Sequence, residues 1–299
     1  MTDYGHDLLF GTFVTPSAQS PQKVVDLAVT GDRAGLDLVT FQDHPYQPAF
    51  LDTWTLISYA AARTSRVHLA GNVHSLPLRP PAMLARSVAS LDRLSGGRIE
   101  LGIGAGAFWD GIEAMGGRRL TAAQGVTALR EAIGIIREVW DVSTRGGIHL
   151  DGEFYQVDGA KRGPEPAHDI PIWVGSYKPK MLELTGAHAD GWLPTLEYFE
   201  GGLESVPGLN RRIDEAAAAA GRSPGDVRRL LNLMNVSLQP TSRALLNGPV
   251  DQWVEDLAGL VLEYGFSAFL IGGDDPAVAE RFAAEIAPQV RELVARERS

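Results

Sequence analysis

Short apolar runs rich in β-branched and aromatic residues recur along the first part of the chain at nearly even intervals. The first four are Leu8–Val14, Leu36–Gln42, Val67–Val73 and Ile99–Gly104, and their starts are 28, 31 and 32 residues apart. Each interval has room for one buried strand and one helix. Because parallel strands need a long crossover connection, this alternation predicts a parallel sheet covered by helices.

Helix signals lie between these strands. Ser20-Pro21 places a capping residue before a proline in the first turn, and that helix is expected to end near Gly35. Asp52 opens a segment that runs to Arg63. Pro81 opens another that runs to Leu94 and is closed by two glycines.

The second half continues the alternation less regularly. Strands are expected over Ile170–Gly175, Trp192–Pro194, Leu230–Val236 and Ala268–Ile271. Helices are expected over Leu120–Val139, Lys178–His188, the alanine-rich stretch around 216–220, Asp251–Tyr264 and Pro276–Arg296. Asp151-Gly152 lies between two short alternating runs within Ile148–Val157, which indicates a hairpin outside the repeating pattern.

Eight strands alternating with helices predict a (β/α)₈ barrel, with a doubly wound open sheet as the alternative. With 299 residues and no Pro-, Ser- or charge-rich linker, the chain is expected to form a single domain, 1–299, with insertions at about 141–169 and 237–249.

Composition excludes several classes of function. The 27 Lys and Arg against 37 Asp and Glu give 27 − 37 = −10, which argues against a general nucleic-acid binder. The absence of cysteine excludes disulfides, thiolate metal sites and a cysteine nucleophile. The N-terminal residues show no signal peptide, and no apolar stretch approaches the ~20 residues of a membrane helix. A cytoplasmic protein is expected.

In a barrel of this kind the active site lies at the carboxyl ends of the strands. The second strand ends at Asp43-His44, a titratable pair suited to exchanging a proton or to hydrogen-bonding a heterocycle. The alternative is that Asp43 caps the following loop while His44 packs. His68 and His74 on the next strand match no metal-ligand spacing, so no metal site is predicted.

The fourth strand runs into glycines. Gly102-x-Gly104-x-x-Ala107 superficially fits the dinucleotide fingerprint, but that motif belongs to a first strand–turn–helix unit, and no clean helix follows here. Glycines that let the backbone approach a flat ring or a phosphate are the favoured interpretation. Tight packing inside the barrel is the alternative, above all for Gly102.

The segment Gly175-Ser176-Tyr177-Lys178 follows the strand that begins at Ile170 and leads into a helix. Small residues with free N–H groups at a helix N-terminus can hold an anion in an acidic protein, and Ser176 and Lys178 could add a hydroxyl and a charge. We expect a phosphate here; the alternative is an ordinary turn with a helix cap.

Several of these segments together resemble the bacterial luciferase-like superfamily of flavin- and deazaflavin-dependent oxidoreductases. The matching pieces are FQDH at the second strand, LDRLSGGR followed by IELGIGAG, PIWVGS, HADGWLP and the ending GGDDPAVAERFAAEIAPQVREL. The resemblance runs from Phe10 to about Leu293. It implies a (β/α)₈ barrel with the cofactor ring at the carboxyl ends of the strands.

The resemblance also implies roles for individual residues. A non-proline cis peptide would lie at Asn72-Val73, against the central ring of the cofactor. His44 would contact the reacting face and Asp43 would orient it. The cofactor path and phosphate would be lined by Gly104, Gly106, Ala107, Phe108, Gly175, Ser176, Tyr177 and Lys178, and the substrate pocket by Thr15 and Trp109.

Asp-His after the second strand is similar to the branch that uses coenzyme F-420, whereas the FMN-using branch more often has Glu-His-His. Hydride transfer between F-420 and a small organic substrate is therefore the leading hypothesis. The alternatives are an FMN-dependent monooxygenase supplied by a partner reductase, and a flavin-binding protein without turnover. Tyr177-Lys178 departs from the glycine-rich phosphate turn common in the family, which bears on the choice of cofactor. A homodimer is implied; the substrate is not.

Overall fold

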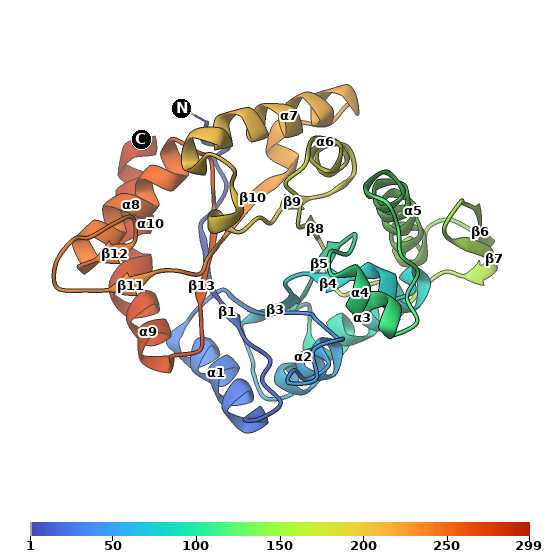
Figure 1. The fold of residues 1–299 in the computed structure, drawn as a ribbon, viewed down its shortest axis with the longest axis horizontal. Helices are drawn as coiled ribbons and strands as arrows, with labels where there is room; N and C mark the ends of the chain where they lie inside the picture. The colour runs from blue at the N-terminus through green and yellow to red at the C-terminus, as the bar shows by residue number, and fades with distance from the viewer. Residues whose placement is uncertain (1) are drawn as a thin grey trace.

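A computed structural model describes residues 2–299 as a closed ring of parallel strands. The strands are β1 (Leu9–Val14), β2 (Leu38–Phe41), β3 (His68–Gly71), β5 (Ile99–Gly104), β8 (Ile172–Val174), β9 (Gly191–Trp192), β10 (Arg228–Leu233) and β13 (Ala268–Gly272). The ring closes because β13 pairs with β1 and β3 pairs with β5 (Figure 1). The predicted (β/α)₈ barrel is confirmed, and the open sheet is excluded.

Helices surround the ring, and most begin and end where the sequence predicted (Figure 1). α1 has Pro21 in its first turn and ends at Gly35, whose φ of 88° is left-handed. Asp52 caps α2 by accepting from the Thr55 amide at 2.8 Å. The helices are α1 (Pro21–Ala34), α2 (Thr53–Ala61), α3 (Pro81–Ser95), α4 (Trp109–Ala114), α5 (Ala122–Trp140), α6 (Pro179–His188), α7 (Val206–Ala219), α8 (Val250–Leu262), α9 (Pro276–Arg281) and α10 (Ala287–Arg298).

The single helix expected over Pro276–Arg296 is wrong. α9 and α10 are separated by a π-helical turn at Phe282–Ile286. Pro288 explains the interruption, because it has no N–H to continue the α-helical ladder and is accommodated in the first turn of α10. No helix within residues 2–299 combines the length and the apolar character that crossing a bilayer requires.

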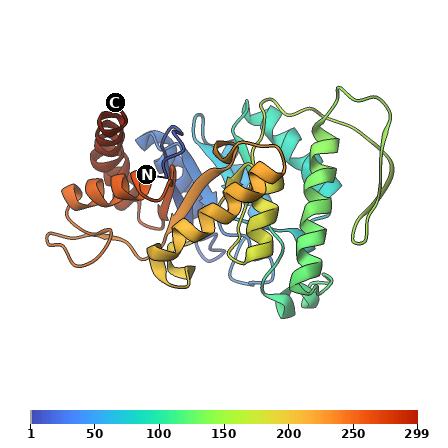
Figure 2. The same cartoon turned by 90° about the horizontal axis from the view of Figure 1, so that it is seen from above.

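Two segments leave the repeating pattern. β6 (Gly147–Asp151) and β7 (Gln156–Lys161) form the expected hairpin, although its connection is 152–155 rather than a two-residue turn. It lies on the outer side of α5 (Figure 2), where Glu131 accepts from the amides of Glu153, Phe154 and Tyr155. β11 (Ser237–Leu238) and β12 (Asn247–Gly248) pair near α8.

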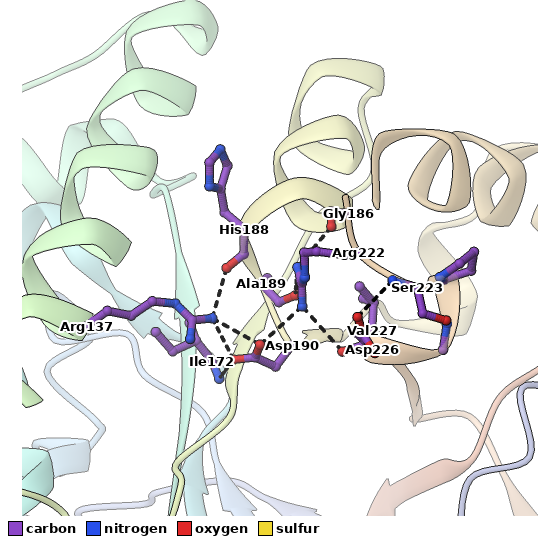
Figure 3. A network of polar contacts seen from close by, with 12 residues as sticks. Arg137, Ile172, Gly186, His188, Ala189, Asp190, Arg222, Ser223, Asp226 and Val227 are labelled. Carbon is purple, nitrogen blue, oxygen red and sulfur yellow. Dashed lines mark hydrogen bonds and ion pairs between the residues drawn. The ribbon is translucent and has the colours of Figure 1, made fainter. Parts of the chain in front are cut away.

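Polar side chains connect strands and helices at the amino-terminal end of the barrel. Asp190 accepts from Arg137 at 2.9 Å, from Arg222 at 3.3 Å and from the Ile172 amide at 2.9 Å, and Figure 3 shows these side chains converging between α5, α6 and β8. Arg98, which is 8% exposed, donates to the carbonyls of Val67 and Ala61. These groups bond to the chain itself and connect the elements at that end of the barrel.

Candidate functional site

A bulge at the carboxyl end of β3 forms the centre of the site. Ala70 pairs with Glu100 and His74 with Ile103, so four steps on one strand match three on its neighbour. The extra residue lies between β3 and β4 (His74–Ser75), and the Asn72-Val73 peptide within it is cis. The expected non-proline cis peptide is therefore present, in a position that bulges beside active sites commonly occupy.

Val73 lies half-buried on top of the apolar interior of the barrel, among glycines from two neighbouring strands. A Cβ on Gly104 would approach Val73 Cγ2 to 2.9 Å, and one on Gly175 to 3.2 Å. Gly102 packs against the Gly71 carbonyl, where a Cβ would come to 2.3 Å. Gly102 is thus a packing residue, while Gly104 and Gly175 leave room for Val73 to form a shallow apolar platform.

An amide network that sequence reasoning missed lies beneath this platform. Asn72 Nδ2 donates to Asn232 Oδ1 at 2.7 Å and to Thr40 Oγ1 at 3.1 Å. Asn232 Nδ2 in turn donates to Asn72 Oδ1 at 3.1 Å and to Thr195 Oγ1 at 3.2 Å. All four residues are buried. The sequence did carry a signal for this network, because Thr40 in LVTF and Asn232 in LLNL are lone polar residues inside otherwise apolar strands.

The expectation that Asp43 orients His44 is wrong. Asp43 is 3% exposed, and its carboxylate accepts from Arg79 at 2.8 and 3.0 Å and from the Ser75 amide at 2.9 Å. Burial alone would raise the pKa of this carboxyl, but the adjacent His74 ring and the Arg79 guanidinium lower that pKa well below its usual range. Asp43 is a fixed anion that holds the loop after β4, and its charge partly opposes the lowering of the His44 pKa by burial.

His44 is oriented by aromatic neighbours instead. Its Nδ1 hydrogen-bonds the Tyr46 hydroxyl, and its ring packs edge-on against Phe108 with centroids 5.1 Å apart. Burial lowers the pKa of His44, and the Asp43 charge opposes that shift only in part. The imidazole is therefore neutral near pH 7, which suits a group that exchanges a proton with a bound molecule. Tyr46 was not predicted.

The remaining predicted residues around His44 come from two strand ends. Ala107 and Phe108 are exposed in the turn after β5, and Trp109 begins α4. Gly106 has φ of 98°, and a Cβ there would meet Pro77 and Trp109. Thr15 follows β1 and is fixed by its amide, which donates to Asp274 at 2.9 Å. These residues lie at the same end of the barrel as His44, since all follow carboxyl ends of parallel strands.

The turn after β8 departs from the expected phosphate cradle. The Ser176 hydroxyl is buried and lies 3.0 Å from Thr185 Oγ1 in α6. The Tyr177 hydroxyl accepts from the Thr195 amide at 2.7 Å, and Lys178 is exposed, with Nζ 2.6 Å from Glu200. In this structure the Ser176 hydroxyl therefore contributes to the packing of α6, and its expected role toward an anion stays a prediction.

His68 and His74 do not come together. His74 is buried 3.5 Å from Asp43, whereas the His68 ring turns to the other end of the barrel.

Comparison with known proteins agrees with this geometry. The family model described as Luciferase-like monooxygenase matches residues 3–295. The chain is 29% identical to a protein of Kineococcus radiotolerans named F420-dependent glucose-6-phosphate dehydrogenase, over 82% of this chain and 72% of that protein. It is 27% identical to a protein of the same name from Nakamurella multipartita, over 95% of this chain and 97% of the relative.

A solved structure has the same fold at lower identity. It is described as an F420-dependent secondary alcohol dehydrogenase in complex with an F420-acetone adduct, and it superposes with a TM-score of 0.82 at 16% identity. The match covers 95% of this chain and 99% of that one. This likeness extends the shared barrel over nearly the whole of both chains.

Proposed function

The chain belongs to the luciferase-like monooxygenase family, and from that premise we propose that it is an oxidoreductase that transfers a hydride between coenzyme F-420 and a small organic substrate. The observation that carries the proposal is the likeness over nearly the full chain to proteins named F420-dependent glucose-6-phosphate dehydrogenase. The bound deazaflavin would supply the hydride chemistry, and the protein would supply position and proton exchange.

The residues at the carboxyl ends of the strands fit a flat ring. Val73 and the turn after β5 would support it, because Gly104 and Gly175 have no side chains to cover Val73, which is half-buried. The buried Asn72–Asn232 pair would hold that platform at a fixed height. Gly106, Ala107 and Phe108 would line one edge, and Thr15 and Trp109 would border the substrate.

His44 is the proposed catalytic residue. With Nδ1 engaged by the Tyr46 hydroxyl, Nε2 is the atom left to exchange a proton with a substrate hydroxyl or carbonyl oxygen. Burial raises the pKa of Tyr46 to about 12, so its phenol stays protonated throughout the working range of the enzyme. Asp43 is a positioning residue that fixes the loop through Arg79 and Ser75.

We propose that the turn after β8 binds the phosphate, but with fewer side-chain groups than the sequence predicted. Gly175, the start of α6 and Lys178 would contribute backbone and charge, while Ser176 and Tyr177 would shape the turn from within through Thr185 and Thr195. Lys178 would exchange its exposed partner Glu200 for the ligand. We also propose a homodimer, as the family resemblance implies, and a cytoplasmic location.

The proposal is tested by titrating the protein with F-420 and with FMN while following fluorescence, and then by supplying substrates. Glucose 6-phosphate and a simple secondary alcohol are the first two to try, with reduction of F-420 as the readout. Tight F-420 binding with substrate-dependent reduction is expected. Oxygen uptake with reduced FMN would support the monooxygenase alternative, with its partner reductase. Binding without any turnover would support a non-catalytic flavin-binding protein.

A further inference from the structure

Three potential ligand side chains meet at the amino-terminal end of the barrel, opposite the site described above. His68 begins β3, Glu100 lies at the start of β5, and His168 lies in the segment that leads into β8. His68 Nδ1 is 2.7 Å and His168 Nε2 is 3.7 Å from Glu100 Oε1. One nitrogen or oxygen from each residue lies within 4.8 Å of the others.

Two of these ligand atoms lack partners among residues 2–299. Glu100 is 7% exposed, and its Oε2 accepts no hydrogen bond; His168 Nε2 is likewise buried and unbonded. Buried polar atoms are nearly always satisfied, so each such atom calls for an explanation. A cation between the three side chains would satisfy both atoms.

His168 is oriented toward Glu100 by a second carboxylate. Its Nδ1 lies 3.0 Å from Asp92 Oδ1, and Asp92 is completely buried and also accepts from the backbone amides of Ile99 and Ala167. The Glu100 carboxylate raises the pKa of His168 to about 9, so a cation has to displace a proton from Nε2; donation from Nδ1 to Asp92 then leaves the Nε2 lone pair pointing into the cluster. A carboxylate behind a ligating histidine is the usual support of protein metal sites.

Space for a further ligand is present beside the cluster. A cavity of about 300 Å³ is lined by His68 and Glu100 together with Asp37, Arg66 and apolar residues from β1 and β2. It can supply a water molecule to an ion held by three side chains. Arg66 and Arg228 oppose a cation here. Arg228 donates to the Asp7 carbonyl, and the charge of Asp37, which acts on Arg228, is shared with Arg291 at 2.6 Å.

We propose that His68, Glu100 and His168 bind a zinc ion, with a water from the cavity as the fourth ligand. Two imidazole nitrogens and one carboxylate oxygen form a donor set that Zn²⁺ accepts at about 2.0–2.2 Å, with tetrahedral geometry. The ion would tie the segment before β8 to β3 and β5. Because the site lies at the end of the barrel away from His44, the ion would stabilise the fold and take no part in the proposed hydride transfer.

The experiment uses the full-length protein after treatment with a chelator. We expect Zn²⁺ or Co²⁺ to bind at about one equivalent per chain, to raise the melting temperature, and in the Co²⁺ form to give the visible absorption of tetrahedral cobalt. His68→Asn and His168→Asn should each weaken Co²⁺ binding by at least tenfold, on the order of the losses seen when metal sites are altered. Glu100→Gln, which keeps the shape but removes the charge, should do the same.

His149→Asn is the matched control, because His149 forms a similar contact with Asp158 at 2.8 Å in the exposed hairpin. It should bind Co²⁺ like the unaltered chain. Equal binding by the His68 and His168 variants, or no stoichiometric binding by the unaltered chain, would overturn the proposal.

A measurement without variants covers the case in which a substitution prevents folding. The proton NMR spectrum of the Co²⁺ form should contain strongly shifted signals from two imidazole rings, including one N–H that exchanges slowly because Asp92 holds it. Absence of that slowly exchanging N–H would refute His168 as a ligand, and shifted C–H signals from one ring only would refute the pair of histidines.

Discussion

The two ends of the barrel hold similar buried aspartates that serve different purposes. Asp92, at the amino-terminal end, accepts from the backbone of Ile99, Ala167 and His168, so it fastens the chain to itself. Asp43, at the carboxyl end, binds Arg79 and Ser75 and holds the loop in which the next residue, His44, is only partly buried. A buried aspartate thus stabilises the fold at the amino-terminal end and positions the candidate site at the carboxyl end.

This difference teaches how to separate stability from function. Substitutions at the amino-terminal end should lower the free energy of unfolding and leave turnover per folded molecule unchanged. Substitutions among the exposed and partly buried residues at the carboxyl end should lower turnover and leave the free energy of unfolding nearly unchanged.

The largest effect is expected for His44→Ala. Loss of a positioned proton-exchanging group typically lowers a rate by about 10²–10⁴-fold, so reduction of F-420 should fall by that factor while the melting temperature changes little. Steady-state absorbance of F-420 measures the rate, and calorimetry measures the stability. His149→Ala, in the exposed hairpin, is the control. Undiminished turnover in His44→Ala would contradict the proposal that His44 is the catalytic residue at the carboxyl end.

Asp190→Ala tests the opposite end. Removing this carboxylate leaves Arg137, Arg222 and the Ile172 amide without their shared acceptor, which should lower the free energy of unfolding by about 2–3 kcal/mol. Urea unfolding measures the change, and Arg281→Ala, which breaks an exposed helical pair, should change stability little. A large loss of F-420 affinity in folded Asp190→Ala would contradict the separation of the two ends.

Asp43→Asn sharpens the comparison through pH. The folded-state pKa of Asp43 lies well below the unfolded value of about 3.9. Its charge therefore stabilises the fold above that value, and the contribution is lost as the pH falls toward the folded-state pKa. Stability of the variant should be lower at pH 7 and should decline less between about pH 4 and 2. Guanidinium unfolding across that range measures it; parallel acid profiles for both proteins would refute the assignment.

The smallest effect is expected for Ser176→Ala. The hydroxyl bonds Thr185 rather than facing outward, so stability should fall by about 1 kcal/mol and F-420 affinity should stay within about threefold. Lys178→Ala, two residues further on and exposed, should weaken F-420 binding more than it changes stability. Fluorescence titration measures the F-420 affinity of both variants. A larger loss of affinity in Ser176→Ala than in Lys178→Ala would support Ser176 as a phosphate ligand.

Much of the architecture followed from local chemistry. The spacing of apolar runs predicted the strands, and Pro21, Gly35, Asp52 and Pro81 predicted the helix boundaries. These features depend only on neighbours in the chain, because capping and proline geometry act within one helical turn. That the whole chain forms one domain stays a prediction.

The long-range partners of the polar side chains at the site were decided by tertiary structure. Asp43 and His44 are adjacent in sequence, yet Asp43 pairs with Arg79 and His44 with Tyr46 and Phe108. Asn72 and Asn232 are separated by 160 residues and bond because the barrel closes. The sequence by itself determined the strand–helix alternation and which residues lie at the strand ends. Only closure of the sheet decided which of them touch, because hydrogen-bond partners depend on distances that no local pattern encodes.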